Sequence, residues 1–380
     1  MKNLFIPLLT LLFTFSGFTQ TTVNGSFIHN GILRNYSFYV PAAYNGSQAY
    51  PLVLNLHGYT SNAAQQSFYG DFKPIADTAH FIIVHPEGTI QTGTANTQFW
   101  NVGFFPSSVD DISFLENLID TISASYSINQ NRIYSTGMSN GGYMSYNLAC
   151  NSDRFAAIAS VTGSMTTSMA VNCNPTKPTP VLEIHGTSDP TVPYNGVSGS
   201  LSIPSVLDYW VSFNNCPVSP VMTNVTNTSI TDGATAEHYV YSAGNGGATV
   251  EHFKVLNGAH TWPGAAITIG VTCMDFDASK EIWRFFSQFE HPTAGLSANK
   301  IWEQQFALWP NPASENIQFS TGDETNGFFS ICDLSGRILL KGEVDNSITS
   351  ITISDLPAGI YTLSFQNKKG CLNKRFIKAQ

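Results

Sequence analysis

The sequence predicts an α/β protein with a mostly parallel, doubly wound sheet of about eight strands, followed by a small all-β domain. Within residues 21–290, short apolar runs that end in glycine alternate with amphipathic stretches of helical period. Residues 291–303 are rich in turn formers and predict a linker. In residues 304–380, short alternating runs are separated by Gly, Pro, Asn and Asp, which is typical of a β-sandwich. The chain of 380 residues also exceeds what one hydrophobic core usually organises.

The first twenty residues, MKNLFIPLLTLLFTFSGFTQ, place a lysine ahead of a short apolar run and then small and polar residues. This order predicts a secretory signal peptide over residues 1–20. The run from Leu4 to Phe15 is too short to span a bilayer and contains a proline, and no later segment is apolar enough to cross a membrane. Export would place the six cysteines in oxidising surroundings, which allows disulfide bonds.

The large domain begins with SFIHNGILRNYSFYVP, whose alternation around an Asn-Gly pair predicts a hairpin. Buried strands are expected at 51–58 and 81–88, where β-branched apolar runs end in glycine. The alternation then continues with strand RIYSTG, helix GGYMSYNLAC, strand FAAIASVTG, strand PVLEIHG, helix VLDYWVSFN, strand EHFKVLNG and helix ASKEIWRFFSQF.

The clearest helix is expected over residues 108–126. Its apolar residues recur at helical spacing and form one stripe. Ser108 can cap this helix, and Asp110 and Asp111 would complement the positive end of its dipole.

The overall composition narrows the range of partners. Apolar residues make up 42% of the chain and charged residues 11%, which fits a folded rather than a disordered protein. The net charge is −9, and the sequence contains neither a basic cluster nor a basic helix. These features argue against nucleic acid or an anionic membrane as partner and favour a neutral substrate.

The stretch Gly137-Met138-Ser139-Asn140-Gly141 matches Gly-x-Ser-x-Gly, a pattern that occurs once in the chain. A predicted strand runs directly into it, and a helical pattern follows. This strand-turn-helix setting holds a serine hydroxyl exposed on a strained turn, and the helix directs its N-terminus at negative charge formed beside the serine. Ser139 is therefore predicted to be a nucleophile.

A serine hydroxyl needs a general base and an acid that orients this base, expected downstream in the order Ser, acid, His. Asp189 follows a strand in the glycine loop of VLEIHGTSDPTVPY, with an ordinary Asp-Pro turn as the alternative. Asp208 and Asp275 are weaker candidates because they are expected on or beside helices. His238 and His252 lie in strand patterns, whereas His260 lies in the loop NGAHTWPG. We predict Asp189 as the acid and His260 as the base.

An acyl-transfer site also needs N–H donors for the oxyanion of its intermediate. One is predicted to be the backbone N–H of Asn140, and the other that of Tyr59 in HGYTSN, with Thr60 as the alternative. His57 is expected to brace this loop. No histidine or cysteine spacing matches a metal site, and no cofactor is expected.

Loop aromatics could contact a substrate. Trp262, two residues beyond the predicted base, and Trp100 are the side chains expected to do so, with Phe68 and Tyr69 as further candidates. Packing in the core is the alternative for all of them.

The segments HGYTSNA, FWN, VDDISFLENLID, GMSNGGYMSYNLAC, HGTSDPTVPYNG and GAHTWPG resemble, in that order, the secreted polyhydroxybutyrate-depolymerase-like and feruloyl-esterase group of α/β-hydrolases. The resemblance implies an α/β-hydrolase fold with Ser139, Asp189 and His260 as catalytic triad. It further implies a secreted serine carboxylic-ester hydrolase that forms an acyl-enzyme on feruloyl or acetyl esters of plant polysaccharide. A polyhydroxybutyrate or related polyester depolymerase is the alternative, and a non-catalytic surface adhesin on a hydrolase fold is another.

The C-terminal segments WPNPASENI, CDLSGRIL and LPAGIYTLSF are similar to the sorting domain of the type IX secretion system. This resemblance implies that the type IX machinery is a partner and that the protein is extracellular or attached to the outer-membrane surface. The sorting domain is expected to take no part in the chemistry. Cys332 and Cys371 depart from the family pattern.

Four cysteines lie in the large domain and allow three pairings. We expect the disulfides Cys150–Cys173 and Cys216–Cys273, because the second would tether the segment that carries His260 to the preceding helix. Buried free thiols are the alternative.

Overall fold

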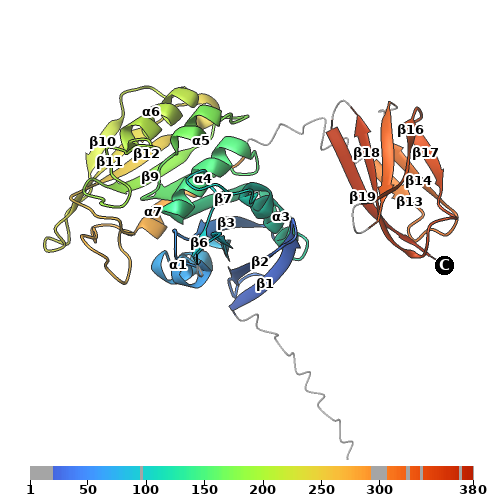
Figure 1. Ribbon diagram of the computed structural model, residues 1–380, viewed down its shortest axis with the longest axis horizontal. Coiled ribbons are helices and arrows are strands. Elements are labelled where there is room, and N and C mark those ends of the chain that lie inside the picture. Colours follow the sequence, from blue (N-terminus) through green and yellow to red (C-terminus); the bar gives the residue numbers. More distant parts are fainter. Residues whose placement is uncertain are drawn as a thin grey trace, which may run out of the picture. The chain divides into compact units, whose positions relative to one another are not determined.

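A computed structural model of the chain describes residues 20–94, 97–291, 306–321, 326–333, 337–367 and 370–379. The expected signal peptide, except its last residue, and nearly all of the expected linker lie outside the described residues. Contacts divide the chain into two compact units, Met1–Pro292 and Thr293–Gln380 (Figure 1). Within the described ranges, no helix is long and apolar enough to cross a membrane.

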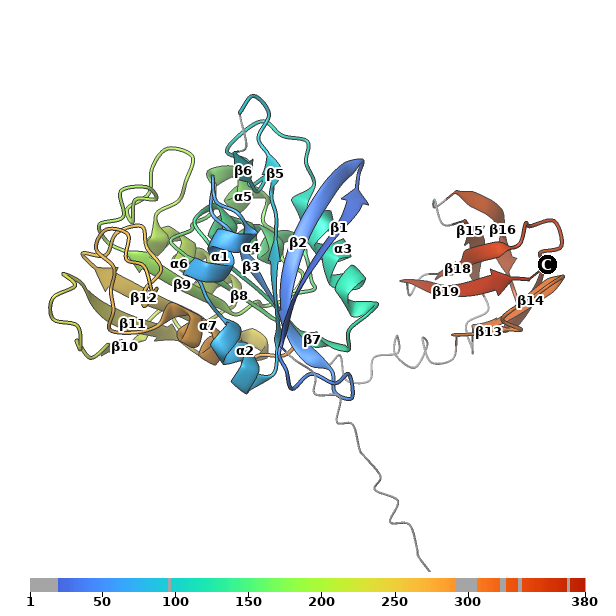
Figure 2. The same cartoon turned by 90° about the horizontal axis from the view of Figure 1, so that it is seen from below.

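The first unit is built on one ten-stranded sheet with the order β1-β2-β4-β3-β7-β8-β9-β12-β11-β10 (Figures 1 and 2). Its parallel strands are β3 (Tyr50–Leu56), β4 (Ile82–Pro86), β7 (Ile128–Met138), β8 (Ala157–Val161), β9 (Val181–Gly186) and β12 (Val250–Leu256). The antiparallel edges are β1 (Thr21–His29), β2 (Ile32–Val40), β11 (Thr235–Tyr241) and β10 (Val221–Asn224). The predicted mostly parallel sheet is confirmed, and it is wider than expected because short, fully exposed strands such as β10 leave no apolar pattern in the sequence.

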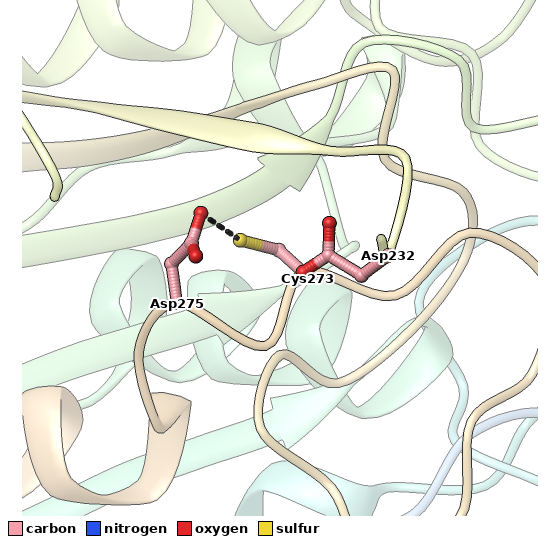
Figure 3. Close-up of side chains that lie close together, drawn as sticks. All are labelled: Asp232, Cys273 and Asp275. Atoms are coloured by element: carbon pink, nitrogen blue, oxygen red, sulfur yellow. Dashed lines mark hydrogen bonds between the residues drawn. The ribbon is translucent and has the colours of Figure 1, made fainter. Parts of the chain in front are cut away.

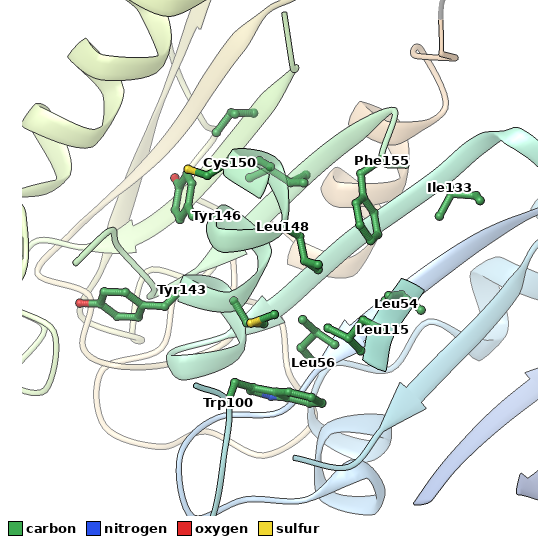
Figure 4. Close-up of a cluster of buried hydrophobic side chains, with 14 of the residues drawn as sticks. Leu54, Leu56, Trp100, Leu115, Ile133, Tyr143, Tyr146, Leu148, Cys150 and Phe155 are labelled. Carbon is green, nitrogen blue, oxygen red and sulfur yellow. The ribbon is translucent and has the colours of Figure 1, made fainter. Parts of the chain in front are cut away.

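Helices cover both faces of this sheet because successive strand side chains point to opposite sides. On β3, Leu54 and Leu56 belong to a core shared with three helices, α3 (Asp111–Ser123), α4 (Asn140–Asn151) and α6 (Ile203–Phe213) (Figure 4). Val53 belongs to the core on the other face, shared with α2 (Lys73–Ala79) and α7 (Ala278–Phe286). The remaining elements of the unit are α1 (Ala63–Tyr69), β5 (Thr89–Ile90), β6 (Gln98–Phe99), α5 (Thr167–Asn172) and η1 (Asn245–Gly247).

The helix predicted over 108–126 is α3, and its cap differs from the expected one. Asp110 rather than Ser108 caps it, because the Asp110 side chain accepts a hydrogen bond from the backbone N–H of Ser113 at 3.0 Å. Asp111 is buried and accepts hydrogen bonds from the Arg34 guanidinium at 2.7 Å and from the Asn101 N–H at 2.7 Å. This ion pair joins α3 to β2 of the N-terminal hairpin.

The described strands of the second unit form two antiparallel sheets, with the orders β13-β14-β17 and β16-β15-β18-β19. Ile317 and Phe319 from the first sheet share a buried core with Ile331 and Leu363 from the second. The predicted β-sandwich is therefore confirmed. Its strands are β13 (Phe306–Trp309), β14 (Asn316–Thr321), β15 (Gly327–Cys332), β16 (Ile338–Val344), β17 (Ile348–Thr352), β18 (Gly359–Asn367) and β19 (Gly370–Lys378).

Candidate active site

Ser139 lies at the turn between β7 and α4, as the sequence predicts. Its backbone has φ +54° and ψ −118°, a conformation that costs a residue with a side chain free energy. Its N–H donates to the carbonyl oxygen of Val161 at 2.8 Å, which ties the turn to β8. A Cβ at Gly137 or Gly141 would approach the carbonyl oxygen of Leu56 to 2.5 or 2.2 Å, so only glycine fits at these two positions of the motif.

Asp189 and His260 are brought together from loops that are 71 residues apart in the chain. Nδ1–H of His260 donates to Oδ2 of Asp189 at 2.7 Å. Oδ1 of Asp189 accepts from the backbone N–H groups of Thr191 and Val192, each at 2.8 Å. Burial alone would raise the pKa of Asp189, but the hydrogen bond and charge of His260, the Val192 N–H and the charge of His185 outweigh it, so the pKa is lowered. Asp189 is thus held as a carboxylate that orients the His260 ring.

Ser139 and His260 line one cavity of about 580 Å³. Its walls include Phe68, which is mostly exposed, and Tyr69, both from α1. Residues Ile267 and Ile269, in the segment between β12 and α7, also line it. Sequence reasoning missed these two isoleucines, because a loop aliphatic carries no motif.

Of the two predicted oxyanion donors, Tyr59 lines this cavity, and Asn140 directly follows Ser139, which also lines it. Asn140 is the first residue of α4, and the first N–H groups of a helix have no partner within the helix. Within the described residues, the Tyr59 N–H donates no hydrogen bond. The Thr60 N–H donates to the Gln98 carbonyl at 3.0 Å. The geometry therefore favours Tyr59 over Thr60 as the second donor.

The loop that carries Tyr59 is held by a neutral histidine. His57 donates from Nδ1 to the Gly58 carbonyl at 2.8 Å and accepts at Nε2 from the Gly88 N–H at 2.9 Å, which defines a single neutral tautomer. Burial lowers the pKa of His57 to about 4. The predicted bracing role of His57 is consistent with these contacts.

Trp100 and Trp262 do not line the cavity, and the prediction that they contact substrate is wrong for their indole rings. Trp100 is 0% exposed, donates from Nε1 to the His57 carbonyl at 3.0 Å, and exchanges backbone hydrogen bonds with the Asn140 side chain at 2.6 and 3.1 Å (Figure 4). Trp262 is 1% exposed and donates from Nε1 to Ser279 Oγ at 3.2 Å. Burial of large aromatic rings stabilises the core, and both indoles pack there although they lie close to motif residues in the sequence.

The first of the two expected disulfides is present and the second is wrong. Cys150 and Cys173 are bonded, with a Cα–Cα distance of 4.6 Å. Cys216 and Cys273 are buried free thiols. They belong to the two cores on opposite faces of the sheet, which no disulfide can bridge.

Cys273 lies instead beside Asp232 and Asp275, with ligand-type atoms within 4.8 Å of one another (Figure 3). Both carboxylates already accept backbone hydrogen bonds, Asp275 from the Thr228 N–H at 2.7 Å and Asp232 from the Met274 N–H at 2.8 Å. Burial and the charges of Asp275 and Asp232 raise the pKa of Cys273 to about 12, so without a metal the thiol keeps its proton and donates to Oδ2 of Asp275 at 3.6 Å. These contacts fasten the loop before α7.

Three comparisons with known proteins bear on this arrangement. Residues 43–202 match the phospholipase/carboxylesterase family, and residues 307–379 match the secretion system C-terminal sorting domain. The acetyl xylan esterase from Aspergillus awamori has a similar structure, with a TM-score of 0.52 and 13% identity over 70% of this chain and 99% of that one. This likeness shows a shared fold.

Curated relatives are similar in sequence. The bifunctional acetylxylan esterase/xylanase of Neocallimastix patriciarum is 24% identical over 70% of this chain, and feruloyl esterase B of Piromyces equi is 29% identical over 47%. This chain spans only 35% of the length of each of these two relatives. Feruloyl esterase D of Neurospora crassa is 26% identical over 68% of this chain and 83% of its own length.

The family match over residues 43–202 contains Ser139 and Asp189 in their predicted order, and His260 follows it on the same sheet edge as Asp189. The first unit thus has an α/β-hydrolase fold in which residues 43–202 match the phospholipase/carboxylesterase family, and residues 307–379 match a secretion system C-terminal sorting domain.

Proposed function

We propose that this protein is a secreted serine carboxylic-ester hydrolase that acts through an acyl-enzyme on feruloyl or acetyl esters of plant polysaccharide. One observation carries the proposal: Ser139 and the Asp189-oriented His260 line the same cavity. The relatives named as acetylxylan and feruloyl esterases support the substrate class. The match to a secretion system sorting domain supports export by the type IX machinery.

In the first half of the reaction, Ser139 Oγ attacks the ester carbonyl carbon while Nε2 of His260 takes the hydroxyl proton. Nδ1–H of His260 continues to donate its hydrogen bond to the Asp189 carboxylate, whose charge stabilises the imidazolium. The oxyanion accepts hydrogen bonds from the Asn140 and Tyr59 backbone N–H groups. The C–O bond to the alcohol then breaks, and His260 returns the proton to the departing oxygen.

In the second half, water replaces the alcohol. His260 takes a proton from this water as its oxygen attacks the acyl carbon of the Ser139 ester. The same two N–H groups stabilise the second oxyanion. Its collapse breaks the bond to Ser139 Oγ, which regains the proton, and the free acid leaves.

The cavity suits an acyl group with an apolar face. Phe68 and Tyr69 on one side and Ile267 and Ile269 on the other offer apolar surface beside Ser139. An aromatic acyl group such as feruloyl would bury more of this surface than acetyl, so methyl ferulate is the preferred small substrate.

The test is a substrate panel of methyl ferulate, acetylated xylan and polyhydroxybutyrate, measured with the wild type and with Ser139→Ala. We expect hydrolysis of the first two, and a loss of about 10⁴-fold or more in kcat/KM for Ser139→Ala because the acyl-enzyme can no longer form. Ser188→Ala, in the neighbouring acid loop, is the matched control and should keep its activity.

Three outcomes would contradict the proposal. Hydrolysis of polyhydroxybutyrate alone would point to the polyester alternative. A Ser139→Ala variant as active as the wild type would show that Ser139 is not the nucleophile. An inactive wild type that binds polysaccharide would indicate the adhesin alternative.

A further inference from the structure

A second histidine lies directly behind the proposed acid. His185, on β9, is fully buried, and its Nε2 lies 3.4 Å from Oδ2 of Asp189, the same oxygen that accepts from His260. On its other side, Nδ1 lies 2.9 Å from Oε1 of Glu183, which is also fully buried. The acid therefore lies between an outer histidine that lines the cavity and an inner histidine paired with a carboxylate.

The partners of His185 define its protonation state. Nε2 lies 2.8 Å from the Val192 carbonyl oxygen, which can only accept, so this nitrogen carries a proton. Nδ1 faces the Glu183 carboxylate, whose second oxygen accepts from the Tyr146 hydroxyl at 2.8 Å. Burial alone would lower the pKa of His185, but the hydrogen bond and charge of Glu183, helped by the Val192 carbonyl and Asp189, raise it. Both ring nitrogens thus face oxygens that can accept from a doubly protonated ring, and burial raises the pKa of Glu183 as well.

Apart from Asp189, the titratable side chains that lie closest to this pair in the described part of the chain are neutral. His252, on β12, has its pKa lowered to about 3 by burial, and its Nδ1–H donates to the Glu183 carbonyl at 3.0 Å. Burial raises the pKa of Tyr194 and of Tyr146, so both keep their protons. Tyr143, on α4, has its pKa raised to about 12 by burial. The charges behind Asp189 are therefore those of Glu183 and His185.

We propose that His185, held as an imidazolium by Glu183, is a positioning residue that fixes Asp189 and offsets its charge. The inference rests on the proposed function, in which Asp189 orients the base His260. An uncompensated buried carboxylate would hold a proton on His260 too firmly, since an opposite charge favours the protonated ring. The inner imidazolium offsets part of the charge of Asp189 and so weakens this effect.

Glu183→Gln removes both charges of the pair and keeps the hydrogen bonds to Tyr146 and His185. The Gln carbonyl accepts from Tyr146, its amide donates to Nδ1 of a neutral His185, and Nε2–H still donates to Val192. With the imidazolium gone, His260 should gain its proton at higher pH. We expect the acid limb of the kcat/KM profile for methyl ferulate, and the NMR titration midpoint of His260, to rise together by about half a pH unit.

The measurement is an NMR titration of the full-length chain with ¹⁵N-labelled histidines, using His260→Asn to assign the outer ring. In the wild type, His185 should keep both ring protons from about pH 6 to about pH 8. Tyr146→Phe is the control, because it removes one hydrogen bond to Glu183 and keeps the charged pair. Its profile should superimpose on that of the wild type.

A singly protonated His185 in the wild type would overturn the proposal, and so would equal shifts, or none, in Glu183→Gln and Tyr146→Phe. If Glu183→Gln fails to fold, the wild-type titration decides alone. The titration needs no turnover, so an inactive wild type would refute the proposed function and still report the state of His185.

Discussion

The two sides of the candidate site are each braced by a buried histidine, and the two histidines differ in charge. On the oxyanion side, His57 meets one donor and one acceptor and is neutral. On the acid side, both ring nitrogens of His185 meet acceptors, and the ring is charged. The difference matches what each side must do. On the oxyanion side, only N–H dipoles face the developing charge. On the acid side, a nearby cation offsets the fixed carboxylate, so that the base His260 can still lose its proton.

The largest effect that tests this comparison is expected from Asp189→Asn. The amide oxygen can still accept from Thr191 and Val192, but its NH₂ group would face Nδ1 of His260 and force the proton onto Nε2. His260 could then no longer accept the Ser139 proton, so kcat/KM for methyl ferulate should fall about 10⁴-fold. Asp208→Asn, an exposed change on α6, should leave the rate unchanged. A small loss in Asp189→Asn would mean that the acid side does not set the tautomer.

A smaller loss is expected on the oxyanion side. Asn140→Ala keeps the backbone N–H that faces the oxyanion but removes the side chain that holds Trp100. The donor would be less well placed, so kcat should fall about 10- to 100-fold with a smaller change in KM. The control is Asn147→Ala on the same helix. Equal kcat values for Asn140→Ala and the wild type would show that this clamp has no part in catalysis.

The smallest effect concerns stability and follows from the neutral state of His57. Its folded pKa of about 4 lies below the unfolded value of about 6.5, so the unfolded chain binds the proton first as pH falls. The stability from this residue is complete above about pH 6.5 and declines toward pH 4. Between pH 7 and pH 5 the wild type should lose about 2 kcal/mol more of its unfolding free energy than His57→Gln does.

Urea unfolding at the two pH values measures this difference. His85 and His252, whose pKa values burial lowers to about 3, remain in both proteins, so their contributions cancel. His80→Asn, a change at an exposed histidine, should follow the wild type. A curve for His57→Gln parallel to that of the wild type would mean that His57 is charged in the folded protein.

The strand-turn-helix setting of Ser139 could be predicted because its signals are local. The Ser139 turn needs glycine at positions 137 and 141, where a Cβ would meet the Leu56 carbonyl, and such steric demands leave a fixed spacing in the sequence. The burial of the Trp262 ring and the free thiol of Cys216 could not be predicted in the same way. An indole beside a catalytic loop can face the cavity or the core, and a cysteine pairing depends on which face of the sheet each residue occupies.

His185 illustrates the same limit. Within VLEIHG it looks like any other strand residue. Its role depends on contacts with Glu183, two positions before it, and Val192, seven positions after it. It also depends on Tyr146 of another element, which donates to Glu183. Period-two alternation places Glu183 and His185 on one side of β9, but the pattern does not show that this side is buried and filled with acceptors.

By itself, the sequence determined the order of strands and helices, the turn at Ser139, and the succession of serine, acid and histidine, since these depend on spacing and on backbone sterics over a few residues. Only the tertiary structure decided which side chains are charged and which aromatics are buried. Protonation and burial are set by every group that surrounds a side chain, and at this site those groups come from β3, β9, β12 and α4 together.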